Sequence, residues 1–384
     1  MWSASIPHRI LILGTAAAVA AGLTVMPVTT SVGPHTADVR LTGSEAVGSP
    51  LGGGTALILG PSGVPTPPQR YADLADELYL QPHGFTGDLE ILTTPERLFF
   101  NRAESRIEGA QILTSAITQQ IAGGQVSAEN PVVAFGYSQS AGFSGMTMEQ
   151  LQDQGVSSDL VRFMLVGNAF APTGGIWTSL GLYPPTPDNL YPSDVYTLEY
   201  DGFADFPRYP LNLLSSLNAF MGIFTQHLAY LNLDADQINN AVLLPGSADL
   251  TGESLTNYYM IPAQTLPLLS PLLLLPVIGE PLYDLLEPVT RILVNLGYGN
   301  ISDGWYPGPA NEPAPLGLFP TDLDWSAVQQ ALIDGVQQGF QNAISGIFQP
   351  WSDLMPLAEA TPFDFADVVS AITAAFAGSD VANT

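Results

Sequence analysis

The sequence predicts an α/β fold, in which helices cover both faces of a mostly parallel, doubly wound sheet. Short apolar runs of strand length alternate with longer segments whose apolar residues recur at helical spacing. The chain has 384 residues, of which 46% are hydrophobic and only 12% are charged, so it can bury a large core. In such sheets the functional site lies at the carboxyl ends of the strands.

Four short apolar runs predict buried strands, and segments with helical spacing separate them. The predicted strands are residues 55–60, 131–138, 161–168 and 195–200. The predicted helices are clearest over residues 70–80, 102–122 and 140–155. Because strands that alternate with helices pair in parallel, this order predicts the sheet described above.

The second half of the chain has a different character. Residues 259–288 are dense in Leu and Pro and almost free of charge, and repeated Pro is expected to prevent a long helix there. This segment is interpreted either as an irregular cover of the core or as an apolar lid or acyl-chain groove. Residues 321–384 predict a helical extension, which we expect to pack on the domain because it lacks the basic residues of membrane-binding helices.

The N-terminal part of the chain predicts export. Residues 10–27 carry no charge and follow a short, weakly positive segment, which is the pattern of an export signal. Their length is close to the minimum that spans a bilayer. Residues 1–28 are therefore predicted to be a signal peptide or a membrane anchor, residues 29–54 a linker, and residues 55–320 the main domain. The domain is expected outside the cytoplasm, either anchored in the membrane or secreted to the cell envelope.

The composition argues against several function classes. Asp and Glu total 36 against 9 basic residues, all Arg, for a formal charge of −27, which argues against nucleic acid and against docking on anionic headgroups by charge alone. The absence of Cys excludes disulfides, thiolate catalysis and Cys-based metal sites. The four His residues lack metal-binding spacing, so neither a metal nor a cofactor is expected.

One turn carries the pattern of a catalytic serine. The residues Gly136 to Ser140, GYSQS, lie between a predicted buried strand and a predicted helix. This is the context of the nucleophile elbow of α/β-hydrolases, G-x-S-x-G, with Ser140 in place of the last Gly. Ser138 is then the nucleophile, and the N–H of Gln139, at the start of the helix, points at the developing oxyanion. The alternative is an ordinary turn between a strand and a helix.

A catalytic serine needs a base and an acid, which usually follow it in this fold in the order acid, then His. His227 is the only His after Ser138 and is the predicted base, whereas His83 precedes the serine and would break the order. The acid is expected just past a strand end, where the sequence offers Asp201 and Asp205. We favour Asp205 and keep Asp201 as the alternative.

The second oxyanion donor is expected from the loop after the first strand, Gly60 to Gly63. Pro61 has no N–H to donate, so the backbone or hydroxyl of Ser62 is the candidate. The alternative is that this loop is a plain turn.

Five motifs together resemble the PE-PPE C-terminal domain of mycobacteria. They are LILGPSGVPTPPQRYADL, FGYSQSA, LVGNAFAPTGG, LEYDGFADFPRYPLNLL and LVNLGYG, and they occur in the family's order over roughly residues 50–300. FGYSQSA and HLAY separately resemble cutinase segments. The family is a cutinase-like serine α/β-hydrolase, so the resemblance implies a Ser-Asp-His triad that acts on acyl esters. Ser138 and His227 occupy matching positions, and the acid matches Asp201 or Asp205.

Two features depart from the family's pattern. An anchor-like segment stands where many members have a PE or PPE helical module, and a chain without Cys lacks the disulfides of cutinases. Anchored members resemble acyltransferases that finish acylated trehalose lipids in the mycobacterial envelope. The resemblance therefore implies an acyl ester hydrolase or acyltransferase whose substrate is a lipid or glycolipid ester. The alternative is a catalytically inactive lipid-binding or surface-interaction protein on the same fold.

Overall fold

The computed structural model describes residues 51–98 and 102–352. The predicted signal or anchor, most of the predicted linker and the end of the C-terminal extension lie outside the described residues. Across the described part, no helix is both long enough and apolar enough to cross a bilayer.

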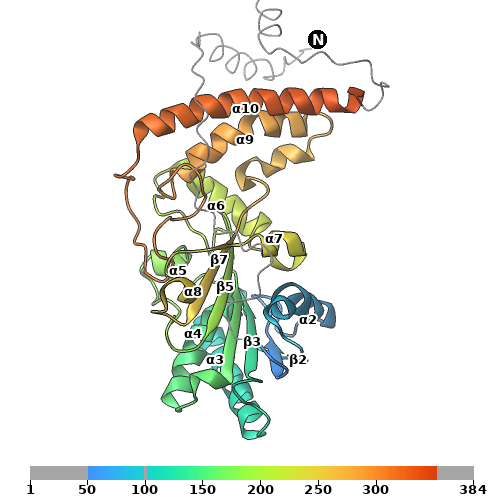
Figure 1. Ribbon diagram of the computed structural model, residues 1–384, viewed down its shortest axis with the longest axis vertical. Coiled ribbons are helices and arrows are strands. Elements are labelled where there is room, and N and C mark those ends of the chain that lie inside the picture. The colour runs from blue at the N-terminus through green and yellow to red at the C-terminus, as the bar shows by residue number, and fades with distance from the viewer. Residues whose placement is uncertain (1–50, 99–101, 353–384) are drawn as a thin grey trace, which may run out of the picture. The chain divides into compact units, whose positions relative to one another are not determined.

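A seven-stranded sheet forms the centre of the described chain, in the order β2-β1-β3-β4-β5-β7-β6 (Figure 1). All neighbouring strands pair in parallel except β6 and β7, which are antiparallel. The strands are β1 (Thr55–Ile58), β2 (Asp88–Ile91), β3 (Val132–Tyr137), β4 (Val161–Val166), β5 (Ser193–Leu198), β6 (Val242–Leu243) and β7 (Thr256–Ile261). The mostly parallel sheet confirms the predicted α/β class.

Helices cover both faces of this sheet (Figure 1). On one face, α3 (Arg102–Ala122) and α4 (Gln139–Asp153) pack their apolar side chains against the sheet. On the other face lie α2 (Gln69–Ala75), the π-helix η1 (Asp76–Leu80) and α7 (Ala235–Asn239). Because successive residues of a strand point to opposite faces, Phe135 of β3 belongs to the second core and Ala134 to the first. The doubly wound arrangement is therefore confirmed.

The remaining α-helices follow β4 and the later strands, and short 3₁₀ helices lie both before and after β4. The α-helices are α5 (Ile176–Ser179), α6 (Leu213–Thr225), α8 (Ala248–Thr251), α9 (Gly279–Asn295) and α10 (Trp325–Ser352), and the 3₁₀ helices are η2 (Gln81–His83), η3 (Ser158–Leu160), η4 (Tyr230–Asn232) and η5 (Pro267–Leu274). The long helix α10 runs alongside α9 (Figure 1). It provides the first helix of the predicted C-terminal extension, and the boundary at residue 320 stays a prediction.

The interpretation of residues 259–288 was wrong in one respect. The segment begins with the buried end of β7, continues as η5 and ends inside α9, so repeated Pro does not prevent a long helix there. Pro281 lies in the first turn of α9, where its missing N–H costs no hydrogen bond. Pro288 is buried within the helix, close to α10. Packing between α9 and α10 therefore offsets the hydrogen bond that Pro288 removes.

Candidate active site

Ser138 occupies a strained turn between β3 and α4. Its backbone has φ 59° and ψ −107°, a combination that a residue with a side chain rarely adopts. A Cβ on Gly136 would lie 2.9 Å from the backbone nitrogen of Ala141, so the strand and helix approach too closely for a larger residue. The turn therefore has the geometry of a nucleophile elbow.

Ser140, which replaces the last Gly of the motif, is fully buried and has a structural role. Its hydroxyl accepts a hydrogen bond from the N–H of Tyr137 at 2.8 Å and donates one to the carbonyl of Tyr137 at 3.1 Å. The substitution thus adds a hydroxyl that ties the end of β3 to the first turn of α4.

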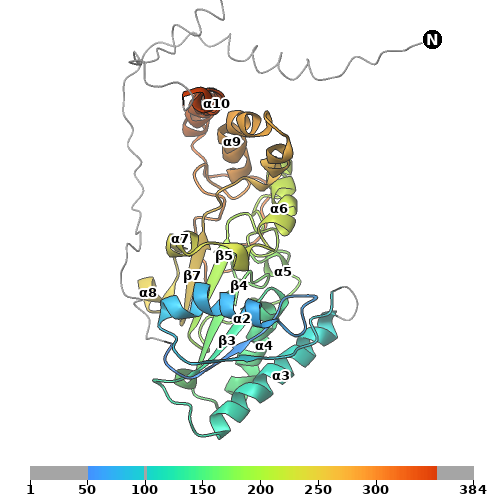
Figure 2. The ribbon, with the colours of Figure 1, turned by 90° about the vertical axis from the view of Figure 1, so that its right-hand side faces the viewer.

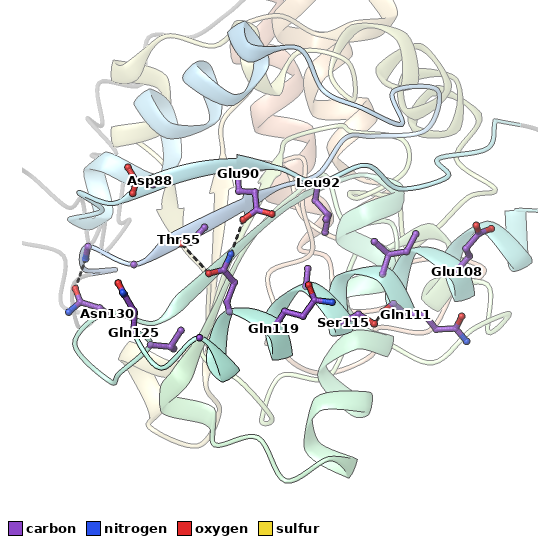
Figure 3. A pocket seen from close by; sticks show the side chains of 17 residues that line it. Thr55, Asp88, Glu90, Leu92, Glu108, Gln111, Ser115, Gln119, Gln125 and Asn130 are labelled. Atoms are coloured by element: carbon purple, nitrogen blue, oxygen red, sulfur yellow. Dashed lines mark hydrogen bonds between the residues drawn. The ribbon is translucent and has the colours of Figure 1, made fainter.

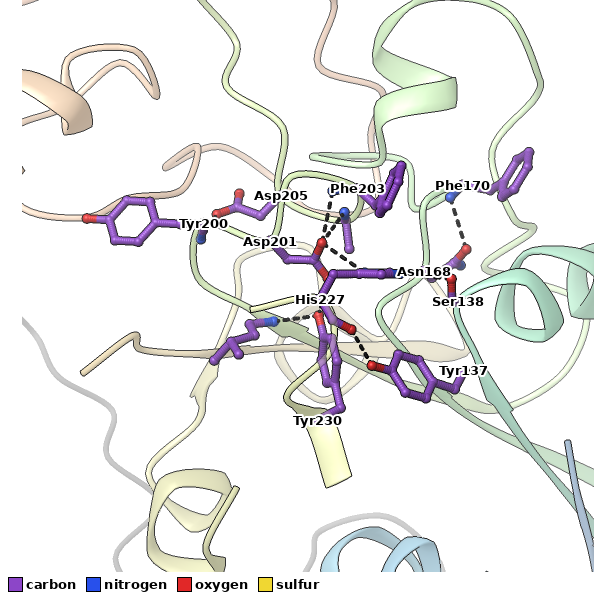
Figure 4. Close-up of polar contacts among 12 residues, drawn as sticks. Tyr137, Ser138, Asn168, Phe170, Tyr200, Asp201, Phe203, Asp205, His227 and Tyr230 are labelled. Carbon is purple, nitrogen blue, oxygen red and sulfur yellow. Dashed lines mark hydrogen bonds and ion pairs between the residues drawn. The ribbon is translucent and has the colours of Figure 1, made fainter. Parts of the chain in front are cut away.

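His227 lies against the serine (Figure 4). Its Nε2 is 2.8 Å from the Ser138 Oγ, and its Nδ1 is 2.7 Å from Oδ2 of Asp201. With Nδ1–H donating to the carboxylate, Nε2 is free to accept the serine hydroxyl proton. The carbonyl of His227 also accepts a hydrogen bond from the hydroxyl of Tyr137, which fixes the backbone that carries the ring.

The preference for Asp205 as the partner of His227 was wrong, because the structure brings Asp201 there instead. Asp201 is fully buried, and besides His227 its carboxylate accepts the N–H groups of Phe203 and Ala204 at 2.9 and 3.3 Å. These backbone donors hold the carboxylate in the orientation that faces the imidazole (Figure 4).

Asp205 is directed away from His227 and closes the turn. Its Oδ2 accepts the N–H of Tyr200 at 2.8 Å, and its backbone carbonyl accepts the hydroxyl of Tyr298 at 3.2 Å. Burial raises the pKa of Asp205 well above its ordinary value, although the Tyr200 N–H opposes that shift. Asp205 therefore caps the loop on which Asp201 is carried.

Tyr230 is a site residue that the sequence reasoning missed. Its hydroxyl donates to Oδ2 of Asp201 at 2.8 Å and accepts the N–H of Leu198 at 2.9 Å. Burial raises the pKa of Tyr230 well above its ordinary value, so the phenol stays neutral and remains a donor. A Tyr within an apolar stretch is usually interpreted as part of the hydrophobic core. The resemblance of HLAY to a cutinase segment was the one sequence feature that pointed to Tyr230.

Glu96 was also missed, and it connects the two predicted oxyanion segments. Its side-chain Oε2 accepts the amide of Gln139 at 2.6 Å, and its main-chain carbonyl accepts the N–H of Gly63 at 2.7 Å. The residue is almost fully buried and has a positive φ of 42°. Burial raises the pKa of Glu96 to about 7, against the lowering effect of hydrogen bonds from Gln139 and Thr94.

Each predicted oxyanion residue carries a donor for which the hydrogen bonds of the described residues give no acceptor. Gln139 is the first residue of α4, and N–H groups in a first helical turn have no acceptor within the helix. The Oγ of Ser62 is buried and has no hydrogen-bond partner among the described residues. Their roles in an oxyanion hole stay a prediction.

His83 lies in a different cluster from Ser138. Its Nε2 is 2.8 Å from the hydroxyl of Tyr196, and its Nδ1 is 3.5 Å from Asp194. Asp194 is the second residue of β5, so this cluster lies near the amino end of a strand whose carboxyl end leads to Asp201.

A cavity of roughly 920 Å³ lies between β2 and α3 (Figure 3). Its lining is polar and acidic and includes Asp88, Glu90 and Glu108. None of the residues around Ser138 lines it, and no His contributes to it. This cavity therefore has no nucleophile and base of the kind found at the elbow. Within the described residues, no group of His, Asp and Glu side chains is arranged to hold a metal ion.

Comparisons with known proteins agree with the motifs. The family described as the PE-PPE domain matches residues 88–299. An uncharacterized PPE family protein of Mycobacterium tuberculosis, PPE28, is 40% identical over 331 residues, which is 80% of this chain and 49% of that protein. Esterase PE16 of the same organism is 39% identical over 312 residues, covering 76% of this chain and 56% of that protein.

Two further matches are shorter or weaker. Diacyltrehalose acyltransferase Chp2 of Mycobacterium tuberculosis is 28% identical over 153 residues, covering 38% of this chain and 40% of that protein. A solved cutinase-like protein from Cryptococcus sp. is 17% identical, with a TM-score of 0.30 over 40% of this chain and 79% of the other. The chain spans about half the length of the first two curated relatives described above.

Proposed function

This chain belongs to the PE-PPE domain family, and we propose that it is a serine-dependent enzyme that cleaves or transfers acyl groups of lipid esters. The observation that carries this proposal is the continuous hydrogen-bonded series from Ser138 Oγ through His227 to the buried Asp201. The name of the relative Esterase PE16, which the chain matches over three quarters of its own length, supports the same reaction class.

The first half of the proposed reaction forms an acyl-enzyme. His227 Nε2 takes the proton of the Ser138 hydroxyl as Oγ attacks the ester carbonyl carbon. Asp201 stabilises the resulting imidazolium through Nδ1–H. The negative charge on the former carbonyl oxygen is stabilised by the N–H of Gln139 and by Ser62. When the tetrahedral intermediate collapses, the leaving alcohol receives its proton from His227.

The second half differs between a hydrolase and an acyltransferase only in the attacking group. Water or an acceptor hydroxyl gives its proton to His227 and attacks the acyl carbon, and Ser138 Oγ takes the proton back as it leaves. We include transfer to a sugar hydroxyl, with acylated trehalose as the candidate substrate, because the relative Chp2 is named a diacyltrehalose acyltransferase.

The catalytic proposal is tested with the Ser138→Ala variant. We expect a fluorophosphonate probe to label the wild-type chain once and to leave the variant unlabelled, with ester turnover lost in parallel. Circular dichroism checks that the variant is folded. An unlabelled, inactive wild-type chain that still binds lipid would favour the alternative, a catalytically inactive lipid-binding protein on this fold.

A second assay separates hydrolysis from transfer. The wild-type chain is incubated with a long-chain acylated trehalose, and free fatty acid and multiply acylated sugar are both measured. Free acid alone supports a hydrolase, and multiply acylated sugar that is absent with Ser138→Ala supports an acyltransferase.

We also propose that the enzyme acts outside the cytoplasm. Residues 10–27 have the pattern of an export signal or an anchor, and a lipid ester of the envelope would be reached from that side. Cell fractionation, with protease treatment of intact cells, tests this location. Protein found only in the cytosolic fraction would contradict it.

A further inference from the structure

We infer that an apolar, uncharged face formed by α6, η5 and the segment that follows η5 docks this protein on a lipid surface of neutral charge, beside the candidate active site. This inference rests on the proposed function, because docking on this face would bring an ester from the lipid layer to Ser138. The face itself is defined by exposure, spacing and charge, independently of catalysis.

The outer side of α6 is a stripe of large apolar residues. Leu213, Leu217, Phe220 and Phe224 are each more than half exposed. Their spacing of four, three and four residues places them on one side of the helix. The residues that α6 buries are small or polar: Ser215, Asn218, Ala219 and Gly222. Four of the large apolar side chains of this helix are therefore directed to the outside, whereas Leu214 packs against the core.

The inner side of α6 is packed tightly, so the outward stripe is held in place. A Cβ on Gly222 would lie 1.9 Å from the carbonyl oxygen of Tyr200, next to the turn that carries Asp201. The hydroxyl of Ser215 donates to the carbonyl of Val294 in α9 at 2.5 Å. With one side fixed by these contacts, α6 cannot rotate to bury Leu217 or Phe220.

The apolar surface continues from α6 onto η5. The buried Asn218 of α6 accepts the N–H of Leu268 at 2.9 Å, which fixes η5 beside α6 (Figures 1 and 2). Residues 273–278 (LLLPVI), which run from the end of η5 to the start of α9, are all exposed. Leu274 is 83% exposed and Val277 is 93% exposed. Val277 also has φ 67°, a strained conformation for a β-branched residue, which no burial of its side chain offsets.

The charge distribution identifies the kind of surface that would cover this face. Residues 209–233 and 254–279 contain no Asp, Glu, Lys or Arg, in a chain with 36 acidic residues and a formal charge of −27. A cationic partner would need carboxylates on the face, and anionic headgroups would be repelled by the chain as a whole. A second copy would bring two strongly negative chains together. A neutral lipid surface needs no carboxylates on the face and is not repelled by the negative charge of the chain.

The face leads directly to the candidate site. α6 ends at Thr225, and His227 follows two residues later with its ring against Ser138. Leu228, the next residue, is 63% exposed and continues the apolar surface. A lipid layer in contact with α6 therefore lies next to the residue that we propose as the base.

The absence of Cys provides a direct test on the full chain. In a Ser138→Ala background, Leu217→Cys and Leu250→Cys each create a unique thiol for a polarity-sensitive dye. Leu250 lies on α8 and is 51% exposed, so it is the matched control. With phosphatidylcholine vesicles, we expect the dye at 217 to shift to the blue and to be quenched by lipids brominated in the acyl chain, and the dye at 250 to remain unchanged.

Both labelled proteins keep the same N-terminal segment, so a difference between the two positions reports the face itself. No response at position 217 overturns the inference, as does an equal response at both positions. A response only with anionic vesicles overturns the neutral surface. A response without lipid that grows with protein concentration identifies a second copy as the occupant and also overturns the inference.

A turnover assay separates this inference from the proposed function. The measured quantity is the turnover of a long-chain ester in neutral vesicles divided by the turnover of a soluble short-chain ester. We expect the double variant Leu217→Asp with Phe224→Asp to lower this ratio by about tenfold or more. Leu250→Asp should leave that ratio unchanged. An unchanged ratio in the double variant overturns the inference. Failure of the wild-type chain to cleave either ester overturns the proposed function, while the dye experiment still decides the docking face.

Discussion

Asp201 and Asp205 lie four residues apart in one turn, and both are buried, yet only Asp201 contacts His227. We therefore expect Asp201→Asn to lower kcat on a soluble ester by roughly 10⁴-fold, because the amide no longer fixes the imidazole tautomer or stabilises the imidazolium. Asp205→Asn should keep kcat within about tenfold and act mainly on stability, since an amide oxygen can still accept the Tyr200 N–H. Steady-state kinetics of the two variants check this, and equal losses would contradict the assignment.

The sequence could locate this acid within one turn but could not choose between the two residues. Both follow the end of β5, and both fit the pattern of an acid loop. The choice depends on backbone hydrogen bonds. The N–H groups of Phe203 and Ala204 orient the Asp201 carboxylate toward His227, whereas the N–H of Tyr200 binds the Asp205 carboxylate. Such donors come from local backbone geometry, which side-chain identity does not reveal.

Glu96 is a second single residue with a measurable effect, because its titration makes the stability of the fold depend on pH. Because burial raises its folded-state pKa to about 7, the folded chain binds its proton more tightly than the unfolded chain, whose pKa is near 4.5. The stability that Glu96 contributes is therefore present below pH 4.5 and is lost as the pH rises through about 7. The loss is at most about 3 kcal/mol, from 1.36 kcal/mol per pKa unit.

Glu96→Gln removes this titration. We expect the difference in unfolding free energy between the wild-type chain and this variant to change by up to about 3 kcal/mol between pH 4.5 and pH 8, with the wild-type chain relatively less stable at pH 8. Urea denaturation at several pH values measures it, and the other carboxylates cancel in the difference. A difference that is independent of pH would show that Glu96 titrates normally.

At the scale of the elements, α9 is tied to the end of β5 by a partly buried ion pair. Arg291 Nη1 is 3.7 Å from Oε2 of the buried Glu199. The Glu199 carboxylate also accepts the N–H groups of Ala263 and Gly304, at 2.7 and 2.8 Å. Arg291→Met leaves the Glu199 carboxylate without its counter-charge. We expect a loss of about 3 kcal/mol in unfolding free energy, at the lower end for such pairs because the two N–H groups remain.

The matched control is Glu287→Gln, which removes the more exposed carboxylate that also contacts Arg291. It should cost less than about 1 kcal/mol, because ion pairs between residues four apart on one helix contribute little to stability. The double variant Arg291→Met with Glu199→Gln should recover part of the loss. Chemical denaturation measures the unfolding free energy of each variant. Equal losses for Arg291→Met and Glu287→Gln would show that the pair with Glu199 contributes no more to stability than the pair with Glu287.

The sequence predicted four strands that are buried along most of their length, because burial gives them a largely apolar sequence. β1, β3, β4 and β5 are short, apolar runs in the middle of the sheet, and they were predicted correctly. The edge strand β2 was missed because its sequence, DLEI, is half polar and exposed, and β6 has only two residues. β7 was missed because its apolar residues run on into the Leu- and Pro-rich segment, where no change of composition marks the strand's end.

At the scale of the whole molecule, the formal charge of −27 is a source of self-repulsion that compaction increases. Salt shortens the range of this repulsion, since the Debye length falls from about 30 Å at 0.01 M to about 8 Å at 0.15 M. The ion pairs described above are few, so screening removes more repulsion than attraction. We therefore expect the Tm of the full chain to rise by roughly 2 °C over that range and to level off by about 1 M, where the Debye length is near 3 Å. Thermal scans in NaCl measure the change, and a Tm that falls with salt would mean that attractive pairs outweigh the net charge.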